Sequence, residues 1–208
     1  MSKPAVLIVD DDSDVRDSLR ALLESAEFDV REYDSARKVL SDPAISQGAC
    51  LIADIRMPDM DGLQLQEELG KRRIGLPVII VTGHGDVPLA VRAMKAGAVE
   101  FMEKPFDGDL MLDAVRRALA LSEQTRSKAQ IAGDAERRIG LLTPREQDVL
   151  RYLVAGRSNK VVAYELGISP RTVEIHRAHL MGKMQARSLS DLIRLALAAG
   201  FTPDEKSA

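Results

Sequence analysis

The first 121 residues alternate short apolar runs with segments in which apolar residues recur every three or four positions. Runs rich in Val, Ile and Leu are typical of buried strands, and the longer period is typical of amphipathic helices. Their alternation predicts an α/β fold with a doubly wound, five-stranded parallel sheet. We expect strands at residues 5–9, 28–33, 49–53, 77–82 and 99–103, and helices at 14–26, 35–43, 62–73, 86–96 and 107–121.

The remainder of the chain has a helical pattern. Residues 122–140 are polar, charged and free of proline, and their composition favours helix, so they predict a linker that extends the preceding helix, with Gly133 as its weak point. Four more helices are expected at residues 144–155, 159–166, 170–185 and 189–198. The chain thus divides into residues 1–121, a helical linker at 122–140 and an all-α domain at 141–208.

Four of the strand-like runs end on polar residues. Asp10 and Asp11 follow the first run, Asp54 ends the third, Thr82 the fourth and Lys104 the fifth. The carboxyl ends of parallel strands share one edge of a sheet, so these side chains are expected to be neighbours. Three carboxylates repel one another, and a hard divalent cation such as Mg²⁺ relieves that repulsion. With a hydroxyl and an amine nearby, the set predicts a phosphoryl-transfer site.

Other α/β classes fit the residues after the first strand less well. A P-loop protein needs a GxxxxGK(S/T) turn there, and a dinucleotide-binding protein needs a glycine-rich turn, whereas this chain has Asp10, Asp11 and Asp12. A metal-dependent phosphatase with an accessory helical domain remains an alternative, although DDDSD matches its DxDx(T/V) pattern poorly. A further alternative is a DNA-binding protein whose acidic domain no longer signals.

The C-terminal part has the spacing of a helix-turn-helix. Ser158 precedes a helix, Gly167 fits the turn, and Ser169 with Pro170 begins a second helix. At 100° per residue, Val173, Leu180, Met184 and the stem of Arg177 share a face of that second helix and are expected to pack inward.

The opposite face of the second helix carries small and polar residues that suit the major groove of DNA. On spacing alone, a three-helix packing unit is the alternative. We expect DNA contacts from Lys160, Arg171, Thr172, Glu174, Ile175, Ala178 and His179. His176 lies at the margin of the core, where a packed position and the contact with the DNA backbone that the family resemblance below implies are equally open.

Charge and composition agree with this division. Residues 1–123 carry 15 Lys and Arg against 23 Asp and Glu, and residues 124–208 carry 14 against 9, so the formal charges are −8 and +5. Acidic clusters suit cations, and a basic helical part suits nucleic acid. The N-terminal apolar stretch is too short for a signal peptide and no run has transmembrane length, so we expect a cytoplasmic protein without a membrane partner. Cys50, the single cysteine, lies in a strand-like run and should be buried.

The first part of the chain resembles the receiver domains of two-component response regulators. The resemblance covers residues 4–121 and rests on VDDD, DIRMPDMDG, TGHGD and EKPF, in that order. It implies the strand order 2-1-3-4-5, and it implies that Asp54 accepts a phosphoryl group from a phosphohistidine. Mg²⁺ would be held by Asp11, Asp54 and the backbone carbonyl of Arg56, with Asp10 acting through water.

The same resemblance implies roles for the residues at the ends of the last two strands. Thr82 would bind a phosphoryl oxygen, Phe101 would be the switch aromatic, and Lys104 would supply a fixed cation before Pro105, where the family often has a cis peptide bond. Such a domain catalyses only its own phosphorylation and dephosphorylation, so we do not expect an enzyme with an external substrate.

The run LTPREQDVLRYLVAGRSNKVVAYELGISPRTVEIHRAHLMGKM resembles the LuxR-type DNA-binding domain over residues 141–200, and the whole chain is thus similar to the NarL/FixJ family of response regulators. The resemblance implies promoter DNA and RNA polymerase as partners, and a homodimer that forms on phosphorylation. The dimer face would consist of Ala90, Val91, Met94, Lys95 and Glu100. The segment TGHGDVPLAVRAMKAGAVEFMEKPF is similar to activators of nitrogen-fixation genes, which implies a FixL-like, oxygen-sensing histidine kinase as donor, although the chain has no haem-ligand motif of its own.

Overall fold

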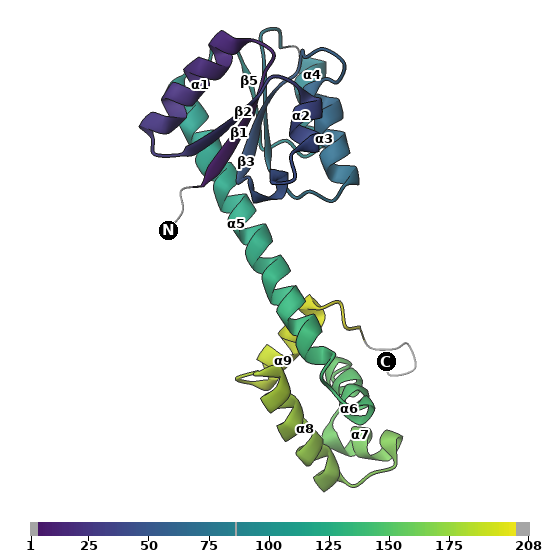
Figure 1. Ribbon diagram of the computed structural model, residues 1–208. Coiled ribbons are helices and arrows are strands. Elements are labelled where there is room, and N and C mark those ends of the chain that lie inside the picture. The colour runs from purple at the N-terminus through teal and green to yellow at the C-terminus, as the bar shows by residue number, and fades with distance from the viewer. Residues whose placement is uncertain (1–3, 86, 203–208) are drawn as a thin grey trace. The chain divides into compact units, whose positions relative to one another are not determined.

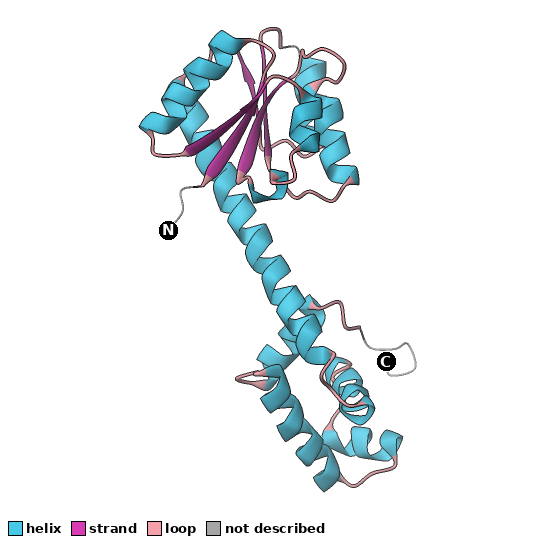
Figure 2. Ribbon diagram, in the orientation of Figure 1, coloured by secondary structure: helices cyan, strands magenta, loops and turns pink. Residues whose placement is uncertain are grey.

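The computed structural model describes residues 4–85 and 87–202, and the chain divides into two compact units between Thr125 and Arg126. The first unit contains a parallel five-stranded sheet of order β2-β1-β3-β4-β5 (Figure 2). The predicted fold and strand order are therefore confirmed. The strands are β1 (Ala5–Val9), β2 (Asp29–Tyr33), β3 (Cys50–Asp54), β4 (Val78–Thr82) and β5 (Glu100–Glu103).

Helices cover both faces of this sheet (Figure 1). Helices α1 (Ser13–Ser25) and α5 (Gly108–Ile139) lie on one face, and α2 (Ala36–Ser41), α3 (Gly62–Lys71) and α4 (Val87–Lys95) lie on the other. Because successive side chains of a strand point to opposite faces, Leu7 and Val9 pack with α2, α3 and α4 while Val6 and Ile8 pack with α1 and α5. Burial on both faces explains why β1 is apolar throughout and why β3 and β4 are apolar up to their last residues, Asp54 and Thr82.

Two helices end two residues before the predicted residue, and the fifth helix extends through the predicted linker. Helix α2 ends at Ser41, before the predicted residue 43, because Asp42 precedes Pro43 and takes an extended conformation. Helix α3 ends at Lys71, and Arg73 has a φ of 56°, which a helix cannot contain. Helix α5 continues to Ile139 and passes through Gly133 without a break, so residues 122–139 belong to the same helix as 108–121. The predicted start of α4 at Asp86 lies outside the described residues.

The second unit is helical, with α6 (Pro144–Val154), α7 (Asn159–Leu166), α8 (Pro170–Met184) and α9 (Leu189–Ala198). A hydroxyl side chain caps each helix by accepting a backbone N–H from its first turn. Gly167 ends α7 with a φ of 63°, which makes the turn that the sequence predicts. Val173, Leu180 and Met184 are fully buried against the other helices, so the predicted inward face of α8 is confirmed.

Among the described helices, none combines the length and the apolar character that crossing a membrane requires.

The buried thiol of Cys50 gives the first testable prediction. Burial inside β3 raises its pKa to about 12. The thiolate is the reactive form, so the neutral thiol should resist alkylation at mildly alkaline pH. We expect intact-mass spectrometry to show no iodoacetamide adduct on the native protein and a single adduct in concentrated guanidinium chloride. Rapid modification of the native protein would contradict the burial of this strand.

Candidate functional site

The carboxyl edge of the sheet brings Asp10, Asp54 and Lys104 into direct contact. Strands β1 and β3 are neighbours, so Asp10 and Asp54 lie side by side where these strands end. The Lys104 amine Nζ lies 2.6 Å from Asp10 Oδ2 and 2.6 Å from Asp54 Oδ1. Asp10 is only 1% exposed and Asp54 only 5%. A single amine therefore bridges two buried carboxylates.

Burial and hydrogen bonding oppose one another in this cluster. Burial raises the pKa of Asp10, and the hydrogen bonds from Lys104 and the Asp12 amide offset only part of that effect. Burial lowers the pKa of Lys104, but its hydrogen bonds to Asp10 and Asp54 outweigh burial and hold the pKa above its usual value. When both carboxylates are ionised, the cluster carries a net negative charge that a second cation would offset.

Backbone amides fix the orientation of the two carboxylates, and one guanidinium holds the backbone at Asp10. Asp10 Oδ1 accepts the Asp12 amide at 3.0 Å, and Asp54 Oδ2 accepts the Arg56 amide at 2.5 Å. The Arg16 guanidinium donates to the backbone carbonyl of Asp10 at 2.7 Å. Sequence reasoning missed Arg16, because nothing in a helical pattern shows that a guanidinium turns back to the preceding strand.

Gly62 allows helix α3 to begin directly against the end of β3. A Cβ at this position would lie 2.3 Å from the Asp54 carbonyl oxygen, which no side chain tolerates. The Gly62 amide donates to the Ile55 carbonyl at 3.1 Å, and Asp61 caps the helix. An Asp-Gly pair is a turn signal that the sequence offers at this point, but only the structure shows that Gly62 lets the helix approach Asp54.

Thr82 and Phe101 occupy the ends of β4 and β5. Thr82 is fully buried, and its hydroxyl donates to the His84 carbonyl and accepts the His84 amide, each at 3.3 Å. This hydroxyl is thus engaged by the loop after β4. Phe101 is half-buried against the core that α4 covers. The bond between Lys104 and Pro105 is cis, as the family resemblance implied.

The carboxylates suit a divalent cation in chemistry but are not arranged as a finished metal cage. In residues 4–85 and 87–202, no three acidic, histidine or cysteine side chains are grouped closely enough to hold an ion. At the carboxyl edge of the sheet, the Lys104 amine fills the point on which Asp10 and Asp54 converge. Asp11 and Arg56, which follow the ends of the same two strands, are exposed. Two buried carboxylates that already share one cation are nevertheless the oxygen donors that Mg²⁺ prefers.

The outer face of α4 is unusually apolar. Val87 is 77% exposed, and Val91 and Met94 are about half exposed. Lys95 is also exposed, Ala90 is half-buried, and Glu100 on β5 pairs with Arg117 at 2.6 Å. Val87 was not among the predicted contact residues, although its spacing of four from Val91 and seven from Met94 places all three on one helical stripe.

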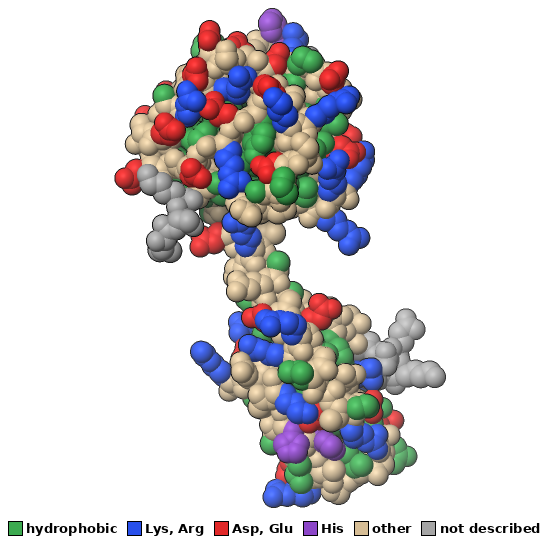
Figure 3. Space-filling model, in the orientation of Figure 1, with side chains coloured by type: hydrophobic (Ala, Val, Ile, Leu, Met, Phe, Trp, Pro, Cys, Tyr) green, Lys and Arg blue, Asp and Glu red, His purple; other side chains and the backbone are tan. Residues whose placement is uncertain are grey.

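Helix α8 presents most of its predicted DNA contacts to solvent. Arg171, Glu174, Ile175, Ala178 and His179 are exposed, and Lys160 is exposed near the start of α7. Two differ: Thr172 is half-buried beside the capping Ser169, and His176 is half-buried with a Nδ1 that has no hydrogen-bond partner among the described residues. Figure 3 shows Lys, Arg and His side chains over the visible face of this helical unit.

Two polar contacts hold α8 in place beneath that surface. The Arg177 guanidinium donates to Asn159 Oδ1 at 2.6 Å, which ties α8 to the start of α7. The buried Glu146 accepts the Lys183 amine at 2.7 Å and the Thr143 amide at 2.8 Å, which ties α8 to the start of α6. The TPRE run is a capping-box signal, so the sequence could have indicated the role of Glu146 at α6 but not its contact with Lys183.

Comparison with known families agrees with both units. Residues 6–116 match the response regulator receiver domain, and residues 140–196 match the bacterial regulatory proteins of the luxR family. The chain therefore belongs to the response regulators that join a receiver domain to a LuxR-type DNA-binding domain.

Relatives match nearly the whole chain. The transcriptional regulatory protein FixJ of Bradyrhizobium diazoefficiens is 46% identical over 204 residues, which cover 98% of this chain and 99% of FixJ. Nodulation protein W of the same organism is 41% identical, over 97% of this chain and 88% of its own. The solved structure of the response regulator StyR matches with a TM-score of 0.79 at 44% identity, over 94% of this chain and 99% of StyR.

Two glycines of α3 provide a matched pair of substitutions. In Gly62→Ala the new Cβ meets the Asp54 carbonyl, so we expect the free energy of unfolding to fall by roughly 2 to 3 kcal/mol. Gly70, in the same helix, has open space where a methyl group would lie, with no neighbouring heavy atom within 4 Å. Gly70→Ala should therefore raise the free energy of unfolding by about 0.5 to 1 kcal/mol. Urea unfolding of both variants checks this, and equal effects would refute the close approach at Gly62.

Glu146 should make the helical unit sensitive to acid. Burial raises its pKa, but the hydrogen bonds from Lys183 and Thr143 outweigh burial and hold the pKa below the usual 4.5. A lowered pKa stabilises the fold above the unfolded value, and this contribution is lost as pH falls through the folded pKa. We expect Glu146→Gln to lower the free energy of unfolding by about 1 to 2 kcal/mol near neutral pH and by less in acid.

Urea unfolding at several pH values would measure that difference. The exposed Glu165 of α7 gives the control, because Glu165→Gln removes the same charge without removing a buried contact. A stability difference between wild type and Glu146→Gln that does not change with pH would contradict the charged contact with Lys183.

Proposed function

We propose that this chain is a cytoplasmic transcription activator that is controlled by phosphorylation of Asp54. The observation that carries the proposal is the buried cluster in which Lys104 bridges Asp10 and Asp54 at the carboxyl edge of the sheet. A nucleophilic carboxylate beside a fixed cation is what acceptance of a phosphoryl group requires.

Asp54 acts as the nucleophile in the proposed reaction. One of its carboxylate oxygens attacks the phosphorus of a phosphohistidine, the phosphorus–nitrogen bond breaks, and the bonding electrons leave with the imidazole, which takes up a proton. The product is an acyl phosphate on Asp54. Lys104 stabilises the negative charge on the transferring oxygens, and the Arg56 amide keeps the carboxylate oriented for attack.

Mg²⁺ is the proposed cofactor. Asp11, Asp54 and the backbone carbonyl of Arg56 would hold it, with Asp10 acting through water, and when bound it supplies positive charge that offsets the charge of the carboxylates and the phosphoryl group. The convergence of Asp10 and Asp54 on one cation supports this assignment.

Phosphorylation is proposed to act through Thr82. Its hydroxyl now bonds to the backbone of His84 and would instead donate to a phosphoryl oxygen on Asp54, which draws the loop after β4 inward. Phe101 would then turn into the space that Thr82 leaves. The resulting change in α4 and β5 would favour a homodimer through Ala90, Val91, Met94, Lys95 and Glu100, and the exposed apolar stripe on α4 supports this face.

The dimer would place two copies of α8 in successive major grooves of promoter DNA. Arg171 can hydrogen-bond guanine, Glu174 can accept from cytosine, and Ile175 and Ala178 can touch thymine methyl groups. Lys160, Thr172, His176 and His179 would contact the backbone or flank the bases. RNA polymerase is the proposed partner for activation.

The similarity to FixJ supports a role in activating nitrogen-fixation genes under low oxygen, with a FixL-like histidine kinase as phosphoryl donor. Nodulation protein W and the response regulator protein TodT match this chain over similar lengths. The identity of the target genes and of the kinase therefore rests on the similarity to FixJ, whereas the rest of the proposal does not.

Intact-mass spectrometry and DNA binding together test the proposed function. With acetyl phosphate and Mg²⁺, wild type should gain about 80 Da, form a dimer and bind DNA more tightly, while Asp54→Asn should do none of these. Chelation of the metal should suppress the gain in mass. If Asp54→Asn dimerised and gained DNA affinity with the phosphodonor, Asp54 would not be the switch.

A further inference from the structure

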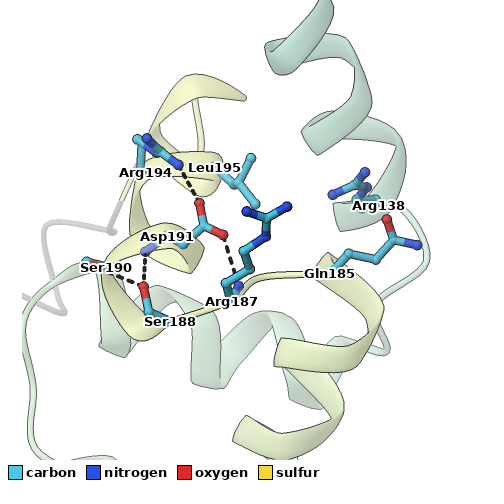
Figure 4. Close-up of a pocket in the computed structure, with 8 residues that line it drawn as sticks. All are labelled: Arg138, Gln185, Arg187, Ser188, Ser190, Asp191, Arg194 and Leu195. Carbon is cyan, nitrogen blue, oxygen red and sulfur yellow. Dashed lines mark hydrogen bonds and ion pairs between the residues drawn. The ribbon is translucent and has the colours of Figure 1, made fainter.

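The helical unit contains a cavity of about 660 Å³ that the proposed DNA contacts leave unused. It lies between the end of α5, the turn that joins α8 to α9, and the first turns of α9 (Figure 4). Three of its lining residues are arginines, namely Arg138, Arg187 and Arg194, and Asp191 is the one acidic residue in the lining. The hydroxyl groups of Ser188 and Ser190 line the same space.

The charges around this cavity are not balanced. The Asp191 carboxylate already accepts the Arg194 guanidinium at 2.6 Å and the Arg187 amide at 2.9 Å. Arg138 donates to the Met184 carbonyl at 2.8 Å, which satisfies a donor without neutralising its charge. The Arg187 guanidinium has no hydrogen bond or ion pair with any residue that the structure describes. The Arg187 amide, the Arg194 guanidinium and the charges of both arginines hold the pKa of the Asp191 carboxylate low. Three guanidinium groups therefore border one cavity with a single carboxylate among its described lining residues.

An anion is the ligand that this arrangement suits. Like charges that border one space repel each other, and an anion between them converts the repulsion into attraction. The first turn of α9, which Ser188 caps, adds the positive end of a ten-residue helix on the same side. A phosphate is favoured over a simple ion because the planar guanidinium fork matches its oxygens.

The position of the cavity indicates that the phosphate belongs to the backbone of DNA. Helix α8 has 15 residues and is therefore about 22 Å long, whereas the major groove is about 12 Å wide. In helix-turn-helix proteins the N-terminal residues of the recognition helix contact base edges. When Arg171 to Ala178 of α8 lie on base edges in this way, the opposite end of the helix extends toward the sugar-phosphate backbone. Gln185 ends α8 and Arg187 follows it, so the cavity lies at that end.

We propose that Arg138, Arg187 and Arg194 form a binding site for a backbone phosphate of duplex DNA. This site rests on the proposed DNA-binding function and adds an anchor at the C-terminal end of α8, opposite the end that reads bases. A phosphate contact carries no sequence information, so the site fixes the position of α8 along the groove and strengthens binding to all sequences alike.

The full-length Arg187→Gln variant tests the proposal. The phosphorylated protein is titrated with a mixed-sequence duplex and with a single-promoter duplex over a range of salt concentrations. Loss of one phosphate contact should reduce the slope of log K against log salt by about 0.9 and weaken binding to both duplexes on the order of fivefold to tenfold at low salt. The unfolding midpoint should change little, because the Arg187 guanidinium makes no hydrogen bond to a described residue and Arg194 still pairs with Asp191 in the variant.

Arg137→Gln is the matched control. Arg137 precedes Arg138 in α5, its side chain is 80% exposed, and it pairs with Asp134, so the variant removes the same charge without touching the cavity. It should leave the salt slope as in wild type. Arg171→Gln provides the contrast, because loss of a base contact should weaken the promoter duplex more than the mixed one.

The outcomes separate the two proposals. If wild type bound neither duplex, the proposed DNA-binding function would fail and the phosphate site with it. If wild type bound DNA and Arg187→Gln kept its affinity and slope, or lost affinity for the promoter duplex alone, only the phosphate site would be overturned. Titration with inorganic phosphate tests whether the ligand is free phosphate instead of a DNA phosphate. If wild type bound free phosphate, and Arg187→Gln abolished that binding while its DNA affinity stayed intact, the assignment to DNA would be overturned.

Discussion

The bridge that Lys104 makes between Asp10 and Asp54 is the interaction on which the receiver unit depends. Two carboxylates withdrawn from water at adjacent strand ends would destabilise the sheet if they were left unpaired. The amine that pairs with them comes from the end of β5, at the far edge of the sheet from β2, so the cluster exists only when the strand order is complete. The proposed phosphoryl transfer to Asp54 rests on the same convergence of charge, so the stability of this edge and its proposed chemistry have one origin.

In the DNA-binding unit, packing and polar contacts hold the polar face of α8 in a fixed orientation. The buried side of α8 supplies Val173, Leu180 and Met184 to a small core, and two polar contacts fix its rotation. Arg177 reaches the start of α7, and Lys183 reaches Glu146 at the start of α6. The exposed side chains of α8 are consequently held in fixed directions, as a surface that reads base edges requires.

Sequence patterns predicted that polar residues at the strand ends would be neighbours, and the structure brings Asp10, Asp54 and Lys104 together, because strand period and parallel topology determine which residues share an edge. Asp11 is exposed instead, and the Thr82 hydroxyl bonds to His84. The same patterns missed Arg16 and the close approach at Gly62, since both depend on how a helix sits on the sheet. The predicted end of α2 was wrong because the helical period continued past the point at which Pro43 excludes a helical conformation. Val87 was missed although its spacing from Val91 was visible in the sequence.

The sequence by itself determined the two-part organisation, the parallel sheet, the acidic strand ends and the capped helices of the helix-turn-helix. Each of these follows from local properties of the chain, such as hydrophobic period, turn residues and capping hydroxyls. Only the tertiary structure decided which groups pair: that Lys104 bridges two carboxylates, that the Thr82 hydroxyl bonds to His84, and that three arginines surround one cavity. The reason is that hydrogen bonds and ion pairs depend on distances of a few ångströms between residues far apart in sequence, and the packing of elements sets those distances.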